Sequence, residues 1–205
     1  MLFDLFGRRN YCGCAYPEPR AELPDPLPAF DRCPVPCRRC ADMPPRTIGL
    51  SSGTGSAVQL TANAGAPTDF VIVGSGGAVT KYAPPAPLVT LTPDEQSAAF
   101  VLPEPSVVRC FSVAFTLSAQ PTSSSAALYA ALLAAPLDSD EYGLVPGSTM
   151  MLAPALTPAL PAGTTLAASV PLCARVPAKL AAVLFAADPS PATVTGHISG
   201  SIYVK

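Results

Sequence analysis

The sequence has 205 residues, with 12 Lys or Arg against 14 Asp or Glu, and its formal net charge is −2. This length fits one domain with an extension, or two small domains. The charge forms no basic stripe of the kind that a nucleic-acid backbone requires. The longest apolar stretch, within 123–138, contains a proline and is shorter than the ~18–20 residues that cross a bilayer. We therefore expect no nucleic-acid partner and no membrane span.

The first 46 residues differ in composition from the rest of the chain. They hold five of the seven cysteines, nine of the 26 prolines and half of the charged side chains. A segment of this composition buries too little apolar surface to offset the conformational entropy that it would lose on folding. We predict an extended Cys/Pro-rich N-terminal arm over 1–46 and a folded body over 47–205. Because Asp4 and Arg8 break the pattern of a secretory signal, synthesis in the cytoplasm without a signal peptide is expected.

The body is predicted to be all-β, a sandwich or barrel. Short apolar or alternating segments recur at intervals of about 8–12 residues, separated by Gly, Pro, Asn and Ser. The segment 126–135 is rich in Ala and Leu, which also form helices well, so a short helix is the alternative to a strand there. The expected strands, in chain order, cover 56–62, 69–74, 78–83, 87–92, 98–103, 107–118, 126–135, 164–173, 179–187 and 193–205.

Two strands show clear alternation, and in the first of them it predicts which side faces the core. The core-facing residues of the first strand are Phe111, Val113, Phe115 and Leu117, and those facing away are Cys110, Ser112, Ala114 and Thr116. In the last strand two sets of residues face opposite sides. One set is Ile198, Gly200, Ile202 and Val204, and the other is His197, Ser199, Ser201 and Tyr203.

Five cysteines lie in the arm, where three chemistries compete. Four thiolates could enclose a zinc ion, although the arm has no histidine and only one C-x2-C pair. That pair, Cys37 to Cys40, lacks the βαβ surroundings of a redox site. Disulfides are the third possibility, and an odd total of seven favours a bridge between chains. We predict cross-linking, with zinc as the alternative on the same residues, which are Cys12, Cys14, Cys33, Cys37 and Cys40.

The remaining motifs favour structure over catalysis. Residues 49–53 satisfy G-x-S-x-G, but without the strand before and helix after that a nucleophilic serine needs, so a glycine-rich loop is expected. The glycines of 74–78 predict a hairpin turn, and the lone His197 is expected to be structural. Cys110 and Cys173 are interpreted as small buried hydrophobic residues. A calcium site in the acidic segment 138–141 is a minor alternative. We expect no enzyme and no cofactor.

Several short motifs of the body occur in the order found in one protein family. They are Leu50–Gly53, Phe111–Val113, Leu128–Ala130, Tyr142, Val145–Ser148, Leu152–Thr157, Pro161–Thr164, Lys179–Phe185 and Gly196–Ile202. With them, residues 47–205 resemble the C-terminal globular domain of the collagen-like exosporium glycoproteins of spore-forming bacteria, particularly the clostridial kind. The collagen repeat that precedes this domain in the family is missing, and the cysteine arm stands in its place.

The resemblance implies a jelly-roll sandwich of the tumour-necrosis-factor or C1q type, commonly a trimer, displayed on a spore surface. It also implies oxidation of the cysteines after the mother cell lyses. The expected function is that of a structural, self-assembling protein of the exosporium, coat or an appendage. Its partners would be copies of itself, as a trimer or fibre, and other spore-surface proteins. The alternatives are a cytoplasmic zinc-dependent interaction module and a ligand- or glycan-binding jelly roll.

Overall fold

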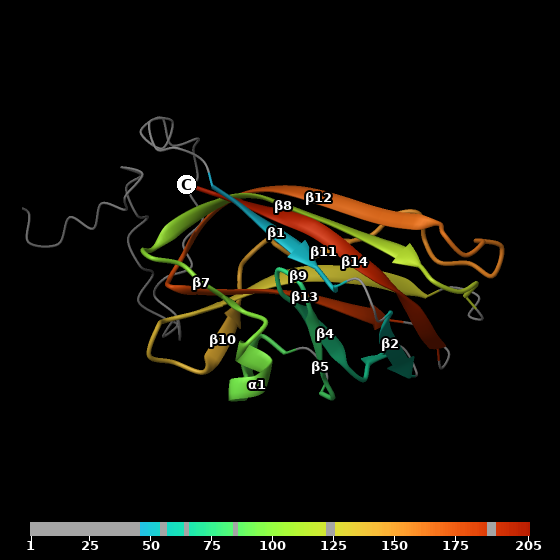
Figure 1. Cartoon of the computed structure of the whole chain (residues 1–205), viewed down its shortest axis with the longest axis horizontal. Coiled ribbons are helices and arrows are strands. Elements are labelled where there is room, and N and C mark those ends of the chain that lie inside the picture. Colours follow the sequence, from blue (N-terminus) through green and yellow to red (C-terminus); the bar gives the residue numbers. More distant parts are fainter. Residues whose placement is uncertain (1–45, 54–56, 64–65, 84–85, 122–125, 188–191) are drawn as a thin grey trace, which may run out of the picture.

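The protein is an all-β sandwich of two antiparallel sheets, and its topology is jelly-roll-like (Figure 1). The computed structural model describes residues 46–53, 57–63, 66–83, 86–121, 126–187 and 192–205. Every ladder between the named strands is antiparallel. In the described part of the chain, no helix has the length and apolar character needed to cross a membrane.

The six-stranded sheet contains both ends of the described chain. Its order is β12-β8-β14-β2-β3, and β1 pairs with β14 beside β2. These strands are β1 (Arg46–Ser51), β2 (Val58–Asn63), β3 (Ala66–Pro67), β8 (Ser106–Leu117), β12 (Thr165–Val176) and β14 (Ala192–Val204).

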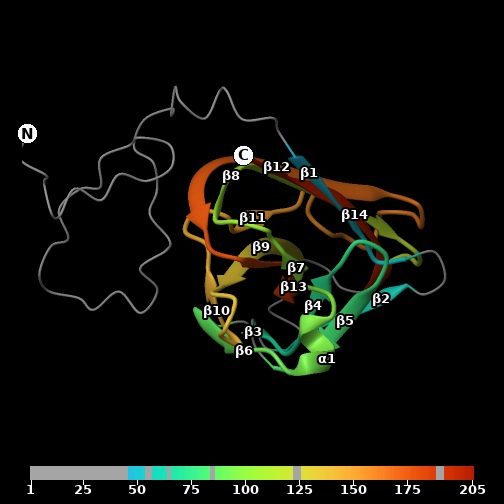
Figure 2. The same ribbon diagram turned by 60° about the vertical axis from the view of Figure 1, so that its left-hand side comes forward.

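The eight-stranded sheet forms the second layer, as the turned view shows (Figure 2). Its order is β5-β4-β13-β9-β10-β6, with β11 on β9 and β7 on β13. Its strands are β4 (Phe70–Val73), β5 (Ala78–Lys81), β6 (Leu88–Thr90), β7 (Phe100–Val101), β9 (Ala127–Ala135), β10 (Glu141–Leu144), β11 (Met150–Met151) and β13 (Lys179–Ala187).

The main core lies between the sheets, and the predicted alternation of β8 and β14 is confirmed. Phe111, Phe115 and Ile202 are fully buried in this core, whereas Ser112 and Ser199 lie on the other face of the same strands. Each methylene buried in such a core contributes about 0.8 kcal/mol.

A second apolar cluster covers the opposite face of the eight-stranded sheet. Phe70, Leu133 and Val183 belong to this cluster, which the segment after β6, with Leu91 and Ala98, closes from outside. Because β9 is buried on both faces from Ala130 to Ala135, its sequence shows no alternation. The alternative of a helix over 126–135 is therefore wrong, and the predicted strand is confirmed.

The covering segment contains a short helix, α1 (Pro93–Gln96), that the strand pattern did not predict. Thr92 caps its first turn, and Glu95 reaches back to the Thr92 N–H in a capping box. Lys81 anchors the helix to β5 through Glu95, at 2.9 Å between Nζ and Oε2. Thr-Pro-Asp-Glu was the available signal, since Ser or Thr followed three residues later by Glu marks a helix start.

Two further expectations near β1 and β4 have different outcomes. The glycine-rich loop expected over 49–53 is wrong for its first half, because residues 46–51 form β1, one residue ahead of the predicted start of the body. The hairpin turn expected over 74–78 is confirmed, since it joins β4 to β5 with Gly74 N donating to Gly77 O at 2.8 Å.

Of the strand expected over 98–103, only Phe100–Val101 pairs with another strand.

Replacing Gly200 by Ala tests how closely β14 approaches β8. A Cβ there would overlap the carbonyl oxygen of Ser112 and lie 3.1 Å from Val113 Cα. We expect a loss of about 1–3 kcal/mol in the free energy of unfolding, because such overpacking displaces backbone. Urea denaturation measures it. The matched control is Gly49→Ala in β1, where a Cβ meets nothing within 4 Å. Equal stabilities for the two variants would contradict the predicted close approach.

Candidate functional site

The outer face of the six-stranded sheet is a regular array of small and hydroxyl-bearing side chains, which we call the hydroxyl face. Strand pairing sets its residues in rows, so that Gly49, Ser201, Ser112 and Ser169 lie side by side across four strands. No Asp, Glu, Lys or Arg occurs among its members, which are Thr47, Gly49, Ser51, Cys110, Ser112, Ala114, Thr116, Thr165, Ala167, Ser169, Pro171, His197, Ser199, Ser201 and Tyr203. Beyond these members, Arg175 also faces away from the core, between the buried Ala174 and Val176.

Neighbouring hydroxyls on this face bond to one another across the strands. Ser112 and Ser169 are 2.8 Å apart at their Oγ atoms, and Thr116 and Thr165 are 2.9 Å apart at Oγ1. Such cross-strand pairs are the usual unit of sheet stabilisation. Removing a hydroxyl from water costs free energy mainly when the hydroxyl is left without a hydrogen-bond partner. A hydroxyl that already has a partner therefore costs less to cover with a second surface. The hydroxyl face can therefore be covered at low cost.

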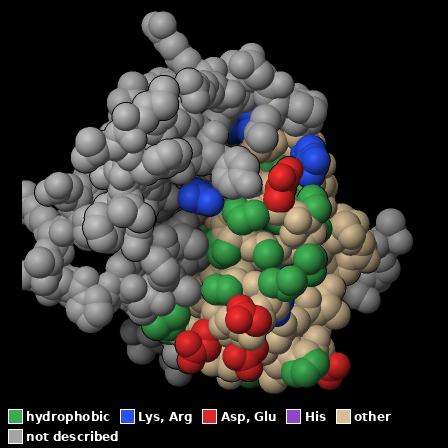
Figure 3. All heavy atoms as spheres, turned by 90° about the vertical axis from the view of Figure 1, so that its left-hand side faces the viewer, with side chains coloured by type: hydrophobic (Ala, Val, Ile, Leu, Met, Phe, Trp, Pro, Cys, Tyr) green, Lys and Arg blue, Asp and Glu red, His purple; other side chains and the backbone are tan. Residues whose placement is uncertain are grey.

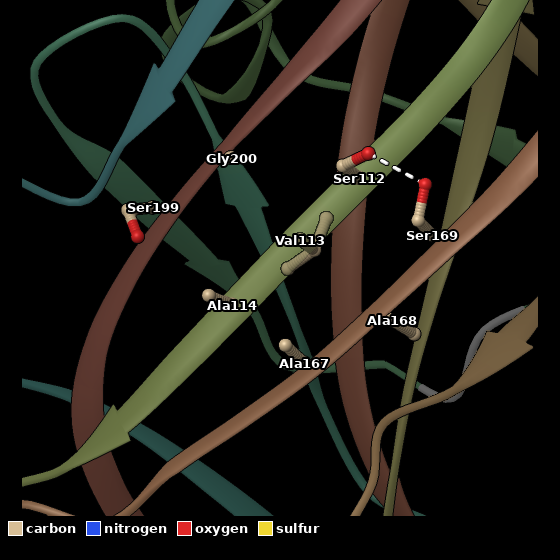
Figure 4. Close-up of a pocket in the computed structure, with 8 residues that line it drawn as sticks. All are labelled: Ser112, Val113, Ala114, Ala167, Ala168, Ser169, Ser199 and Gly200. Atoms are coloured by element: carbon tan, nitrogen blue, oxygen red, sulfur yellow. Dashed lines mark hydrogen bonds between the residues drawn. The ribbon is translucent and has the colours of Figure 1, made fainter.

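A shallow depression of ≈ 400 Å³ lies in the middle of the hydroxyl face (Figure 4). Ser112 and Ser169 point toward each other on one side of it, and the methyl groups of Ala114 and Ala167 lie beside them. Its lining consists of Ser112, Val113, Ala114, Ala167, Ala168, Ser169, Ser199 and Gly200. Because no aromatic or charged side chain lines it, the depression lacks the convergent polar groups that orient a small ligand.

Acidic, basic and hydrophobic side chains are all present on the side of the molecule shown in Figure 3. Arg46 lies 3.9 Å from Glu104, and the hydrophobic side chains of Val101 and Leu137 are 67% and 62% exposed. Among the described residues, no group of three or more His, Cys, Asp or Glu could hold a metal ion, so the calcium alternative has no geometric support.

Two buried serines from the family-like motifs complete strand ladders. In the Leu50–Gly53 motif, Ser52 Oγ accepts from Ile198 N at 2.9 Å. In the Val145–Ser148 motif, Ser148 Oγ accepts from Leu132 N at 3.0 Å and donates to Val145 O at 2.7 Å. Each serine supplies the acceptor that a missing strand neighbour would otherwise provide.

Ser51, the serine of the G-x-S-x-G pattern, serves a turn. Its Oγ accepts from Gly53 N at 3.1 Å, and Gly53 has a φ of +89°, which favours glycine. His197 lies on the hydroxyl face opposite Thr116. Neither residue belongs to a described catalytic arrangement.

The arm cysteines Cys12, Cys14, Cys33, Cys37 and Cys40 lie outside the described residues, so the predicted cross-links and their zinc alternative stay predictions. The two body cysteines are described, and the expectation that they are buried is wrong. Cys110 and Cys173 are free and partly exposed.

Comparison with known proteins leaves the family open. No family model matches the chain, and no curated protein matches it. A solved structure described as "Structure of infectious bursal disease virus Gx strain" is similar at 16% identity and a TM-score of 0.38. The match covers 78% of this chain and 32% of that one, so the chain spans about a third of its length. This distant likeness supports no statement about the function or partners of the chain. The resemblance to the exosporium glycoproteins stays a prediction.

A buried phenol in the second apolar cluster provides a test of that cluster. Tyr142 is fully buried, and its hydroxyl has no hydrogen-bond partner among the described residues. Burial raises the pKa of Tyr142 to about 12. Since the unfolded chain ionises this phenol near pH 10, its contribution to stability is complete below that pH and is lost as the pH rises toward 12.

Replacing Tyr142 by Phe should raise the free energy of unfolding by about 1 kcal/mol at neutral pH, because an unpaired buried hydroxyl is removed. The advantage should grow between pH 10 and 12, where only the wild type loses the phenol's contribution. Urea denaturation at several pH values measures both effects. Tyr129→Phe, a partly exposed ring stacked on Phe185, is the control and should change little. A destabilised Tyr142→Phe variant would reveal a partner for the hydroxyl.

Proposed function

We propose that the protein is a structural subunit of a spore-surface layer or appendage. In this proposal its body associates with other copies through the hydroxyl face, and its arm cysteines link the copies covalently. The observation that carries the proposal is the hydroxyl face, an uncharged sheet surface whose hydroxyls bond to one another. The spore location follows from the family resemblance of the sequence.

The size of the hydroxyl face supports association with a second copy. With strands ~4.8 Å apart and same-face residues ~6.8 Å apart along a strand, its members cover about 500 Å² of sheet. Two copies in contact would bury about 1,000 Å², which is the lower limit for a specific interface. A surface without charge offers no like-charge repulsion to an identical surface, so self-association is favoured over a strongly charged partner.

The edge of the same sheet supports contact through the face rather than through added strands. The twelve-residue strand β12 lies at the edge, where free backbone groups could pair with another chain. Ala153 already bridges Ala167 on that edge, Pro171 removes one donor, and a bulge interrupts the ladder between Pro171 and Ala174. Proteins commonly protect edge strands with these devices.

A charge placed in the hydroxyl face tests the association. Ala114→Glu puts a carboxylate beside the depression, and we expect the dissociation constant between bodies to rise at least tenfold, because the interface would bury an unpaired charge. Analytical ultracentrifugation in reductant isolates this non-covalent step. Ser75→Glu, exposed in the turn between β4 and β5, is the matched control and should associate like the wild type. Unchanged association of Ala114→Glu would contradict the proposed face.

The covalent step is tested separately. Electrophoresis without reductant should show a ladder that collapses to the 20.9 kDa chain when reductant is added. The variant with all five arm cysteines changed to Ser should give no ladder. A monomer under both conditions, with stoichiometric zinc by elemental analysis, would favour the zinc-dependent module instead.

A further inference from the structure

A cysteine and an arginine meet where two irregularities of the six-stranded sheet coincide. On β8, the pairing with β14 skips Arg109, since Cys110 pairs with Tyr203 and Val108 with Val204. On β12, the pairing with β8 skips Leu172 and Cys173, between Pro171 and Ala174. Bulges of this kind re-aim side chains and occur next to functional sites. Here they bring Arg109 Nη1 to 3.3 Å from Cys173 Sγ, where it donates a hydrogen bond.

The two body cysteines have different surroundings. Cys173 is partly exposed and accepts a hydrogen bond from the cationic guanidinium of Arg109. Cys110 is also partly exposed, but it contacts hydroxyls, at 3.4 Å from Ser169 Oγ and 3.7 Å from Ser112 Oγ. Reactive cysteines are found in partly exposed, electropositive places, because the attacking sulfur is negatively charged. Cys173 has this environment and provides an internal comparison with Cys110.

We propose that Cys173, with Arg109, is a reactive site that exchanges with alkyl disulfides. The Cys173 thiol gives its proton to water, and the resulting thiolate attacks one sulfur of a disulfide, so that a new S–S bond forms and the old S–S bond breaks. The departing thiolate keeps the bonding electron pair and takes a proton from water, so the number of disulfides is unchanged and no oxidant is consumed. Arg109 donates its hydrogen bond to the attacking sulfur.

The disulfide can come from a small molecule or from an arm, and the second source rests on the proposed function. Arg46, where the described chain begins, pairs with Val204, which in turn pairs with Val108 of β8. From β1 to β12 there are three strand spacings, about 14 Å. Cys40 lies six residues before Arg46, and six residues can span about 20 Å. An arm cysteine can therefore reach the Cys173 site.

The reactivity is measured on the full chain with all five arm cysteines changed to Ser, using glutathione disulfide as the probe. Two variants of this chain are compared: one carries Cys110→Ser and keeps Cys173, and the other carries Cys173→Ser and keeps Cys110. Cys173 in the first should react at least tenfold faster than Cys110 in the second. Arg109→Gln should slow Cys173 about tenfold and leave Cys110 unchanged, and Arg109→Lys should restore part of the rate. Thermal melting followed by circular dichroism confirms that each variant is folded.

Arg46→Gln removes the same charge at a distance from the site and should not alter the rate. Equal rates for the two cysteines, or equal slowing by Arg46→Gln and Arg109→Gln, would overturn the proposal. The rates are measured on dilute, unassociated protein, because Cys110 belongs to the hydroxyl face. A failure of self-association therefore leaves them interpretable. Peptide mapping of the oxidised wild-type chain then separates the sources: Cys173 joined to an arm peptide supports the arm, and a small-molecule adduct alone rules the arm out.

Discussion

The burial of apolar surface on both faces of the eight-stranded sheet is the constraint on which the architecture depends. The inner face packs against the six-stranded sheet, and the outer face is closed by the segment that carries α1. That segment is held in place by the ion pair between Lys81 and Glu95, whose side chains are mostly buried. The carboxyl of Glu95 has a lowered pKa: burial opposes ionisation, but the bonds from Lys81 and Thr92 outweigh it. With that sheet covered twice, the hydroxyl face is the broad sheet surface that the described residues leave uncovered.

The open face and its edge have complementary properties. Small side chains line the middle of the face, and the hydroxyls of Ser112 and Ser169 bond to each other there. The edge, by contrast, is interrupted by a bridge, a proline and a bulge. Together they favour contact between finished sandwiches over exchange of strands. The bulge that interrupts the edge is also one of the two irregularities that bring Arg109 to Cys173.

The sequence predicted the strands whose two faces differ and was less informative elsewhere. Alternation predicted the core side of β8 and separated the two faces of β14 correctly, because one face of these strands is buried and the other is more exposed. In β9 both faces are buried, so only length and flanking residues could separate strand from helix. β1 was missed because Gly49 within it and Gly53 just after it suggest a loop until its partner β14 is known. The contact between Arg109 and Cys173 depends on two register shifts, which no local pattern records.

The interrupted edge of β12 has a consequence for crowded conditions. A long, unguarded edge lets identical chains join into cross-β aggregates, whose growth is hard to reverse. Here Ala153 and Pro171 leave little continuous backbone with which a strand of another chain could pair. The protein can thus be made at high local concentration and still meet its neighbours as folded particles.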